Sequence, residues 1–300
     1  MRSFTGLLLI VICASTAHAA DYKLYFLGGQ SNMDGFGYAS ELPDTGDGGV
    51  AGVRIFRGNV AADDEVGGGK GLWAPLTPGF GLDFTTDGVS NSLSDRFGPE
   101  LTFGTHMKVL FPDDNIAILK YSRGGTALME GASGYGTWAP DYDGVNQYDH
   151  ALNAIRIALS STDIDGDGEY DNLQPAGIVW MQGEADAYDS EAASRNYEAN
   201  LKRMMDLLRA ALRTDDLPVV IGRITDSGRD EDGKVMDYSD VVQAGQEAFV
   251  DKDSCAAYDR VTDELAYPED DDWHYTTDGY LKMGESFAET MAALETRCGR

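Results

Sequence analysis

The sequence predicts an α/β fold, with a single doubly wound domain whose central, mainly parallel sheet is flanked by helices. Two observations predict it. Strand-like apolar runs alternate with helical patterns along the chain, which is typical of a parallel sheet covered on both faces. No Pro/Ser-rich linker or internal repeat divides residues 20–300, so we expect one domain.

The strands are expected where short apolar runs occur, and the helices where apolar residues recur three or four positions apart. The strand-like runs are residues 23–27, 115–121, 176–181 and 217–224, with a weaker run at 255–258. The helical patterns cover residues 100–110, 148–159, 191–212, 241–250 and 277–294. Residues 39–94 are rich in Gly and Asp and break the alternation. We interpret them as a long irregular insertion that either forms one wall of the site or is a surface excursion.

Residues 1–19 have the pattern of a secretory signal peptide. Arg2 precedes a short apolar run, and Ala17-His18-Ala19 matches an A-x-A cleavage site. The apolar run is too short for a membrane-spanning helix, and no later segment qualifies. We therefore expect residues 20–300 to form a secreted or periplasmic domain without membrane insertion.

The formal net charge of −28 argues against nucleic acid as a partner, because binding it requires a basic surface. The same acidity mildly favours neutral over polyanionic substrates. Removal of residues 1–19 also removes Cys13 and leaves Cys255 and Cys298 in an oxidising compartment. A single disulfide between them is one interpretation, and two unrelated buried thiols are the other.

A candidate nucleophile follows the first strand-like run, in Gly29-Gln30-Ser31-Asn32-Met33. A serine hydroxyl is a poor nucleophile until the fold places it at a strand end beside a base and backbone N–H donors. The candidate base is His274, because Asp271 stands three residues before it and can hold its Nδ1–H. Asp272 is the lesser candidate for that carboxylate.

Two further segments follow strand-like runs and could each supply an oxyanion donor. One is Ser122-Arg123-Gly124-Gly125-Thr126, and the other is Trp180-Met181-Gln182-Gly183-Glu184-Ala185-Asp186. Arg123 is a candidate substrate-binding residue, although it could equally pair with a nearby Asp. Glu184 is a second candidate of this kind. Glu184 and Asp186 together are more typical of supporting hydrogen bonds than of a glycosidase acid/base pair.

In this order, the four segments resemble the SGNH hydrolase superfamily and, within it, the sialate O-acetylesterase-like (SASA) carbohydrate esterases. The resemblance extends from about residue 23 to about residue 292 and includes Phe97-Gly98-Pro99-Glu100-Leu101 and the run from His274 to Glu285. It implies that Ser31 attacks an acetyl carbonyl, His274 takes its proton and Asp271 orients His274. It also implies an oxyanion hole made of the Ser31 N–H, the Gly125 N–H (or that of Gly124) and the Gln182 amide.

A separate acidic segment has the spacing of an EF-hand-type calcium loop. Its carboxylates and the position seven carbonyl come from Asp163, Asp165, Asp167, Glu169 and Asp171, with Gln174 in place of the usual bidentate Glu. The alternative is a solvated acidic turn. Any calcium here would be structural, and no cofactor is expected for catalysis.

These observations favour an exported esterase that removes O-acetyl groups from an acetylated carbohydrate. One alternative is a general short-chain esterase or lipase of the same superfamily. Another is a calcium-dependent glycan-binding protein with a degenerate hydrolase fold, although such a protein has no need of an Asp-x-x-His segment and a strand-end serine.

Overall fold

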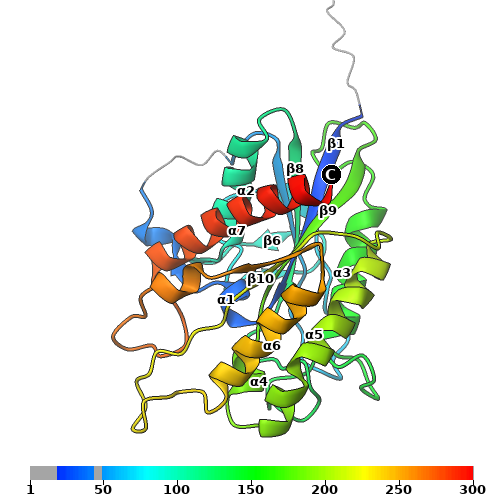
Figure 1. The fold of residues 1–300 in the computed structure, drawn as a ribbon. Helices are drawn as coiled ribbons and strands as arrows, with labels where there is room; N and C mark the ends of the chain where they lie inside the picture. The colour runs from blue at the N-terminus through cyan, green and yellow to red at the C-terminus, as the bar shows by residue number, and fades with distance from the viewer. Residues whose placement is uncertain (1–18, 44–48, 300) are drawn as a thin grey trace, which may run out of the picture.

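Seven strands form the central sheet of the computed structural model, which describes residues 19–43 and 49–299 (Figure 1). Their order is β11-β10-β9-β1-β8-β3-β4, and all neighbours are parallel except β3 and β4. The strands are β1 (Asp21–Gly29), β3 (Val53–Arg57), β4 (Trp73–Pro75), β8 (Asn115–Ser122), β9 (Asn172–Met181), β10 (Val219–Gly222) and β11 (Ala256–Asp259). The predicted α/β fold is therefore confirmed.

Helices cover both faces of this sheet, as Figure 1 shows. α2 (Glu100–Leu110) and α7 (Thr277–Cys298) pack together on one face, and α3 (Gln147–Ser160), α5 (Glu191–Ala211) and α6 (Ser239–Lys252) lie on the other. Two short helices, α1 (Ser31–Asp34) and α4 (Glu184–Ala187), follow β1 and β9 directly. Two small strand pairs lie outside the sheet: β2 (Gly37–Tyr38) with β7 (Arg96–Phe97), and β5 (Thr85–Thr86) with β6 (Asn91–Ser92). Two short 3₁₀ helices also lie outside it, η1 (Ala39–Glu41) and η2 (Val261–Glu264).

Local sequence explains where the long helices begin. Asn146 caps α3 through a capping box, in which its side chain accepts from the backbone of Asp149 while the Asp149 side chain accepts from Asn146. The Thr276 hydroxyl accepts from the Gly279 N–H and starts α7 directly after the Asp-x-x-His segment. The start of α7 therefore fixes the end of the loop that carries His274.

The stretch 39–94 is not the irregular insertion that its composition predicted. Val53–Arg57 forms β3, which pairs with β8, and β4 extends the sheet by one antiparallel strand. Leu76 and Phe80 are buried in the core. The described part of this stretch therefore completes one edge of the sheet. The prediction of an irregular insertion, which both interpretations shared, was wrong because β3 and β4 belong to the sheet.

A buried ion pair supports the centre of the fold. Lys120, inside β8, has no exposed surface, and its Nζ donates to Glu100 Oε2 at 2.6 Å and to the carbonyl oxygens of Asp34 at 2.8 Å and Phe80 at 3.0 Å. Burial lowers the pKa of Lys120 to about 8, against the opposing effect of the Glu100 carboxylate. One ammonium group thus joins α1, the 39–94 stretch and the first turn of α2.

Cys255 and Cys298 form a disulfide with a Cα–Cα distance of 5.9 Å. It ties the end of α7 to the residue before β11, so the disulfide interpretation is confirmed and the two-thiol alternative is wrong. The predicted signal peptide, residues 1–19, falls almost wholly on residues 1–18, which lie outside the described residues.

Candidate active site

The carboxyl ends of β1, β8 and β9 lie side by side at the centre of the sheet. Gly29 pairs with Ser122 of β8 and with Met181 of β9 in the strand register. The strand order also changes direction here: β8 and β3 lie on one side of β1, and β9, β10 and β11 lie on the other. Open α/β sheets form their ligand sites at such a point.

The turn after β1 requires a glycine before the serine. Gly29 has a φ of +145°, and a Cβ there would lie 1.9 Å from the carbonyl oxygen of Met181. This close approach lets the Gln30 N–H donate to the Met181 carbonyl at 3.0 Å. Ser31 then begins α1 and lies at the end of β1, where the sequence placed it, with 7% of its surface exposed.

The loop before α7 holds an aspartate–histidine pair. Asp271 Oδ2 lies 2.7 Å from His274 Nδ1, and Oδ1 accepts from the backbone N–H groups of Trp273 and His274 at 2.8 and 3.0 Å. The His274 ring stacks on Phe36, with a centroid distance of 3.5 Å. Asp272 instead pairs with Arg229 at 3.6 Å, so the structure places Asp271, and not Asp272, on the imidazole.

The pKa values of this pair keep the imidazole neutral and the carboxylate charged. Burial lowers the pKa of His274 below its ordinary 6.5, and the Asp271 carboxylate only partly offsets this effect. Burial alone would raise the pKa of Asp271, but the hydrogen bonds from the Trp273 N–H and from His274 outweigh it and lower that pKa. A neutral imidazole whose Nδ1 faces a carboxylate has Nε2 available as a base.

Ser31 and His274 line one cavity of about 610 Å³. Among the described residues no hydrogen bond joins the Ser31 hydroxyl to the imidazole, which is common in the absence of substrate. Gly124, Gly125 and Trp273 also line this cavity. The structure therefore brings together the serine, the Asp271–His274 pair and the glycine segment that the sequence singled out.

Backbone N–H groups at this cavity are available as oxyanion donors. Over the described ranges, the N–H groups of Ser31, Gly124 and Gly125 donate no hydrogen bond to the protein. A Cβ built on Gly124 would lie 3.3 Å from Ser31 Cβ, so Gly124 lies directly against the serine. Gly125 has a φ of +72° and lies beneath the Tyr135 ring. The structure thus places both candidate glycines at the cavity.

Gln182 does not fit the role that the resemblance implied. Its side chain is fully buried, and Nε2 donates to the Thr126 carbonyl at 3.1 Å and to Asp186 Oδ2 at 2.6 Å. Both amide hydrogens are therefore used inside the protein, away from the cavity. In this arrangement Gln182 and Asp186 instead hold the loop after β8, because Asp186 also accepts from the Leu128 N–H at 2.8 Å.

Glu184 and Arg123, the candidate substrate-binding residues, also point elsewhere. Glu184 is buried, which raises its pKa, and its Oε1 accepts from Asn32 Nδ2 at 2.7 Å. The same Nδ2 donates to the Trp273 carbonyl, so Asn32 connects the serine turn to the His274 loop. Arg123 Nη1 donates to the Ala61 carbonyl at 2.5 Å. Neither side chain lines the cavity that contains Ser31.

Sequence reasoning missed several residues that do line the cavity. Tyr135, Tyr188 and Asp189 come from loops after β8 and α4, and the two tyrosines are 68% and 50% exposed. No motif marked them. Among the tryptophans, Trp273 lines the cavity, whereas Trp138 and Trp180 pack against each other in the core.

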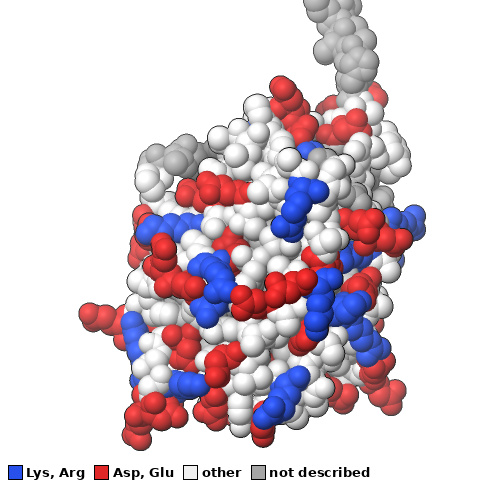
Figure 2. All heavy atoms as spheres, viewed as in Figure 1, with Lys and Arg blue, Asp and Glu red and all other residues white. Residues whose placement is uncertain are grey.

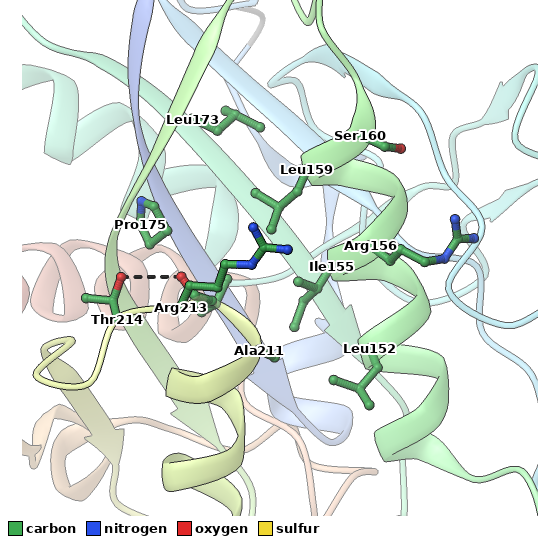
Figure 3. Close-up of a pocket in the computed structure, with 11 residues that line it drawn as sticks. Leu152, Ile155, Arg156, Leu159, Ser160, Leu173, Pro175, Ala211, Arg213 and Thr214 are labelled. Atoms are coloured by element: carbon green, nitrogen blue, oxygen red, sulfur yellow. Dashed lines mark hydrogen bonds between the residues drawn. The ribbon is translucent and has the colours of Figure 1, made fainter.

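A second cavity of about 670 Å³ lies beside the amino-terminal half of β9, at the end of that strand opposite to the Ser31 cavity (Figure 3). It lies between α3, the end of α5 and the first half of β9, and its walls are mainly apolar. Arg156 and Arg213 are its charged lining residues, and none of its described lining residues is an Asp, Glu or His. The groups needed for ester hydrolysis are therefore found in the cavity of Ser31.

Three carboxylates of the acidic loop lie together. Asp163, Asp165 and Asp171 each place an oxygen within 4.8 Å of the others, whereas Asp167 and Glu169 are not part of this cluster. The loop immediately precedes β9, so it lies at the amino-terminal edge of the sheet, opposite Ser31. A cation here could act on the fold but could not touch the reacting atoms.

Acidic side chains are spread over the face of the molecule shown in Figure 2, with basic side chains between them. Within the described ranges, no helix has the length and apolarity needed to cross a membrane.

Two of three comparisons with known proteins gave matches. A protein-family model described as carbohydrate esterase, sialic acid-specific acetylesterase, matches residues 21–293. The comparison with curated proteins gave no match. Among solved structures, a protein from Arabidopsis thaliana has a TM-score of 0.62 at 17% identity, covering 91% of this chain and 98% of its own.

Two further solved structures are similar to nearly the same extent. NanS has a TM-score of 0.60 at 18% identity, covering 92% of this chain and 98% of its own. A carbohydrate acetylesterase from Xanthomonas citri has a TM-score of 0.59 at 15% identity, covering 91% of this chain and 57% of its own. At these identities the structural similarity establishes a shared fold.

Proposed function

Because the chain belongs to the sialic acid-specific acetylesterase family of carbohydrate esterases, we propose that it removes O-acetyl groups from carbohydrates through an acyl-serine intermediate. The observation that carries the proposal is a single cavity lined by Ser31, by His274 with Asp271 behind its Nδ1, and by Gly124 and Gly125, whose N–H groups donate no hydrogen bond within the described residues. As a member of this family it is a carboxylic ester hydrolase.

In the proposed acylation step, Ser31 Oγ attacks the acetyl carbonyl while His274 Nε2 takes its proton. Asp271 holds Nδ1–H, which fixes the tautomer and stabilises the imidazolium that forms. The N–H groups of Ser31 and of Gly124 or Gly125 would hold the oxyanion. His274 then protonates the departing sugar hydroxyl. In the second half, His274 activates a water that releases acetate and restores the serine.

The test is acetate release by the purified protein from acetylated xylan and from O-acetylated sialic acid. Release from either supports the proposal, and release from neither by a folded protein contradicts it. A series of aryl esters of increasing acyl length separates this function from that of a general esterase or lipase. We expect kcat/KM to be highest for acetate and to fall with each added methylene.

The pH dependence of kcat/KM should report His274. His274 acts as a base only when neutral, so activity falls as the pH drops through its pKa. Since burial lowers that pKa, we expect the midpoint of the acid limb to lie below 6.5. Asp271→Asn removes the interaction that raises the His274 pKa, so the midpoint should move to lower pH, while kcat falls by about 10²- to 10⁴-fold. A midpoint that moves to higher pH in this variant would contradict the assigned roles.

We also propose that the protein is exported, on the basis of the signal-peptide pattern of residues 1–19. Expression of the full chain with a C-terminal tag tests this, with cleavage read by N-terminal sequencing of the mature protein. A mature protein that begins close to residue 20, outside the cytoplasm, is the expected result. Retention of Met1 on the active protein would contradict it.

Calcium binding by the Asp163–Asp171 loop remains a prediction. If the loop binds calcium, removing the ion should lower the Tm without changing the Ser31 cavity, because binding to the folded state alone stabilises it. We expect calcium at about 100 times its Kd to raise the unfolding free energy by about 2.7 kcal/mol, and Asp163→Asn to abolish this shift. Differential scanning calorimetry with calcium and with chelator measures it, and identical Tm values would support the solvated-turn alternative.

A further inference from the structure

We propose that this cavity selects acetylated sugars that carry no negative charge and discriminates against sugars that bear a carboxylate. The inference rests on the proposed function and deepens it by naming the substrate class. Its evidence is the charge and the aromatic lining of the cavity, together with the way in which nearby arginines are engaged.

The charged groups of the cavity are of one sign. Asp189 is the only Asp, Glu, Lys or Arg among the described residues that line it. Its carboxylate is exposed and makes no ion pair or hydrogen bond within the part of the chain that the structure describes. His274 adds no positive charge at neutral pH, because burial lowers its pKa. A carboxylate on a bound sugar would therefore meet another carboxylate and no cation, which is an arrangement that disfavours binding.

Three arginines that adjoin residues of the site are engaged with protein groups: Arg123 precedes Gly124, Arg96 lies 5.9 Å from the Phe36 ring, and Arg229 contacts the loop before His274. Arg123 donates to the Ala61 carbonyl. Arg96 donates to the Phe36 carbonyl at 2.6 Å and to the Tyr38 hydroxyl at 2.6 Å, and its guanidinium lies 3.5 Å from the centre of the Tyr38 ring. Arg229 donates to the carbonyl oxygens of the loop 267–271. None of these three side chains lines the cavity, so a bidentate arginine clamp, the usual recognition of a carboxylate, would require one of them to move.

The cavity is equipped for an uncharged ring. Tyr135 and Tyr188 are exposed at the cavity, and Tyr188 packs edge-on against Trp273 with a centroid distance of 5.4 Å. Tyr135 lies over Gly125, beside the proposed oxyanion donors. Tyrosine offers an apolar face to the C–H groups of a sugar and a hydroxyl to its oxygens. These aromatic faces supply binding that needs no charge on the substrate.

The charge selectivity is tested with a matched pair of substrates. O-acetylated sialic acid and its C1 carboxamide carry the same acetyl group and differ by one negative charge. We expect kcat/KM to be about tenfold higher for the carboxamide, and Asp189→Asn to narrow this ratio about threefold. Asp216→Asn removes the same charge at the amino-terminal edge of the sheet and should leave the ratio unchanged. Equal kcat/KM for acid and carboxamide, or a preference for the acid, overturns the proposal, and an unchanged ratio in Asp189→Asn overturns the role of that residue.

The proposed contact between the tyrosines and the sugar is tested through KM. Tyr188→Ala should raise KM for an acetylated xylooligosaccharide about tenfold more than it raises KM for 4-nitrophenyl acetate. Tyr170→Ala is the control and should change neither value, because Tyr170 is an exposed tyrosine in the loop before β9, away from the cavity. Equal changes on both esters in Tyr188→Ala overturn the stacking role. Hydrolysis of 4-nitrophenyl acetate without hydrolysis of any sugar ester contradicts the proposed function itself, whereas hydrolysis of the acid and carboxamide at equal rates contradicts only the selectivity.

Discussion

Replacing Ser31 by Ala should lower kcat for acetate release by roughly 10⁴-fold or more, because the acyl-enzyme can no longer form. Some hydrolysis above the rate in water should remain, since the backbone N–H donors at Gly124 and Gly125 are unchanged. The effect should fall on kcat more than on KM, because the hydroxyl reacts with the acetyl group rather than binding the sugar. Initial rates on 4-nitrophenyl acetate and on an acetylated xylooligosaccharide measure both constants.

Folding of this variant should be unaffected. The Ser31 hydroxyl makes no hydrogen bond among the described residues, so its removal leaves no buried partner unsatisfied. Ser160→Ala, at the end of α3 and beside the second cavity, is the matched control and should retain full activity. Full activity in Ser31→Ala, with a normal Tm, would remove this serine from the mechanism.

Glu100→Gln should destabilise the protein by about 3–5 kcal/mol, because it breaks a buried ion pair and leaves the Lys120 ammonium uncompensated. Both side chains have no exposed surface, and Glu100 Oε1 also accepts from the Gly98 N–H at 3.0 Å. Chemical denaturation of the purified variant measures the change as a lower midpoint at an unchanged slope.

The matched control is Glu191→Gln, which removes an exposed i,i+4 pair with Arg195. That change should cost no more than about 0.5 kcal/mol. A loss below about 1 kcal/mol in Glu100→Gln would show that water or another group compensates Lys120. Since Lys120 also donates to the Asp34 carbonyl, we expect reduced activity in Glu100→Gln at temperatures where the variant is still folded.

The strands of the sheet core could be predicted because they are buried on both faces and read as continuous apolar runs. β3 could not, because it is only five residues long and contains Arg54 and Arg57. Arg57 is 1% exposed and pairs with Asp34, a contact between residues 23 positions apart that no local pattern encodes. Lys120 is a second example. It lies inside a strand that could be predicted, but its partner Glu100 lies on α2, and no local pattern indicates that contact.

At the site, sequence order was informative where the chemistry depends on a short motif. Ser31 is set by the turn after β1, and Asp271 and His274 by a spacing of three residues. The roles suggested for Gln182 and Arg123 do not match this geometry, because Asp186 and the Thr126 carbonyl accept from the Gln182 amide and the Ala61 carbonyl accepts from Arg123. Tyr135 and Tyr188 reach the cavity from loops whose paths are decided by tertiary packing.

Labelling the wild-type protein with a fluorophosphonate, and mapping the modified peptide by mass spectrometry, determines whether Ser31 is the acyl acceptor. We expect stoichiometric labelling of the peptide that contains Ser31, with activity lost in proportion. Labelling should be weaker in His274→Ala, because the base that activates the hydroxyl is absent. Activity that survives complete labelling of Ser31, or inactivation with the label on another residue, would contradict this role of Ser31.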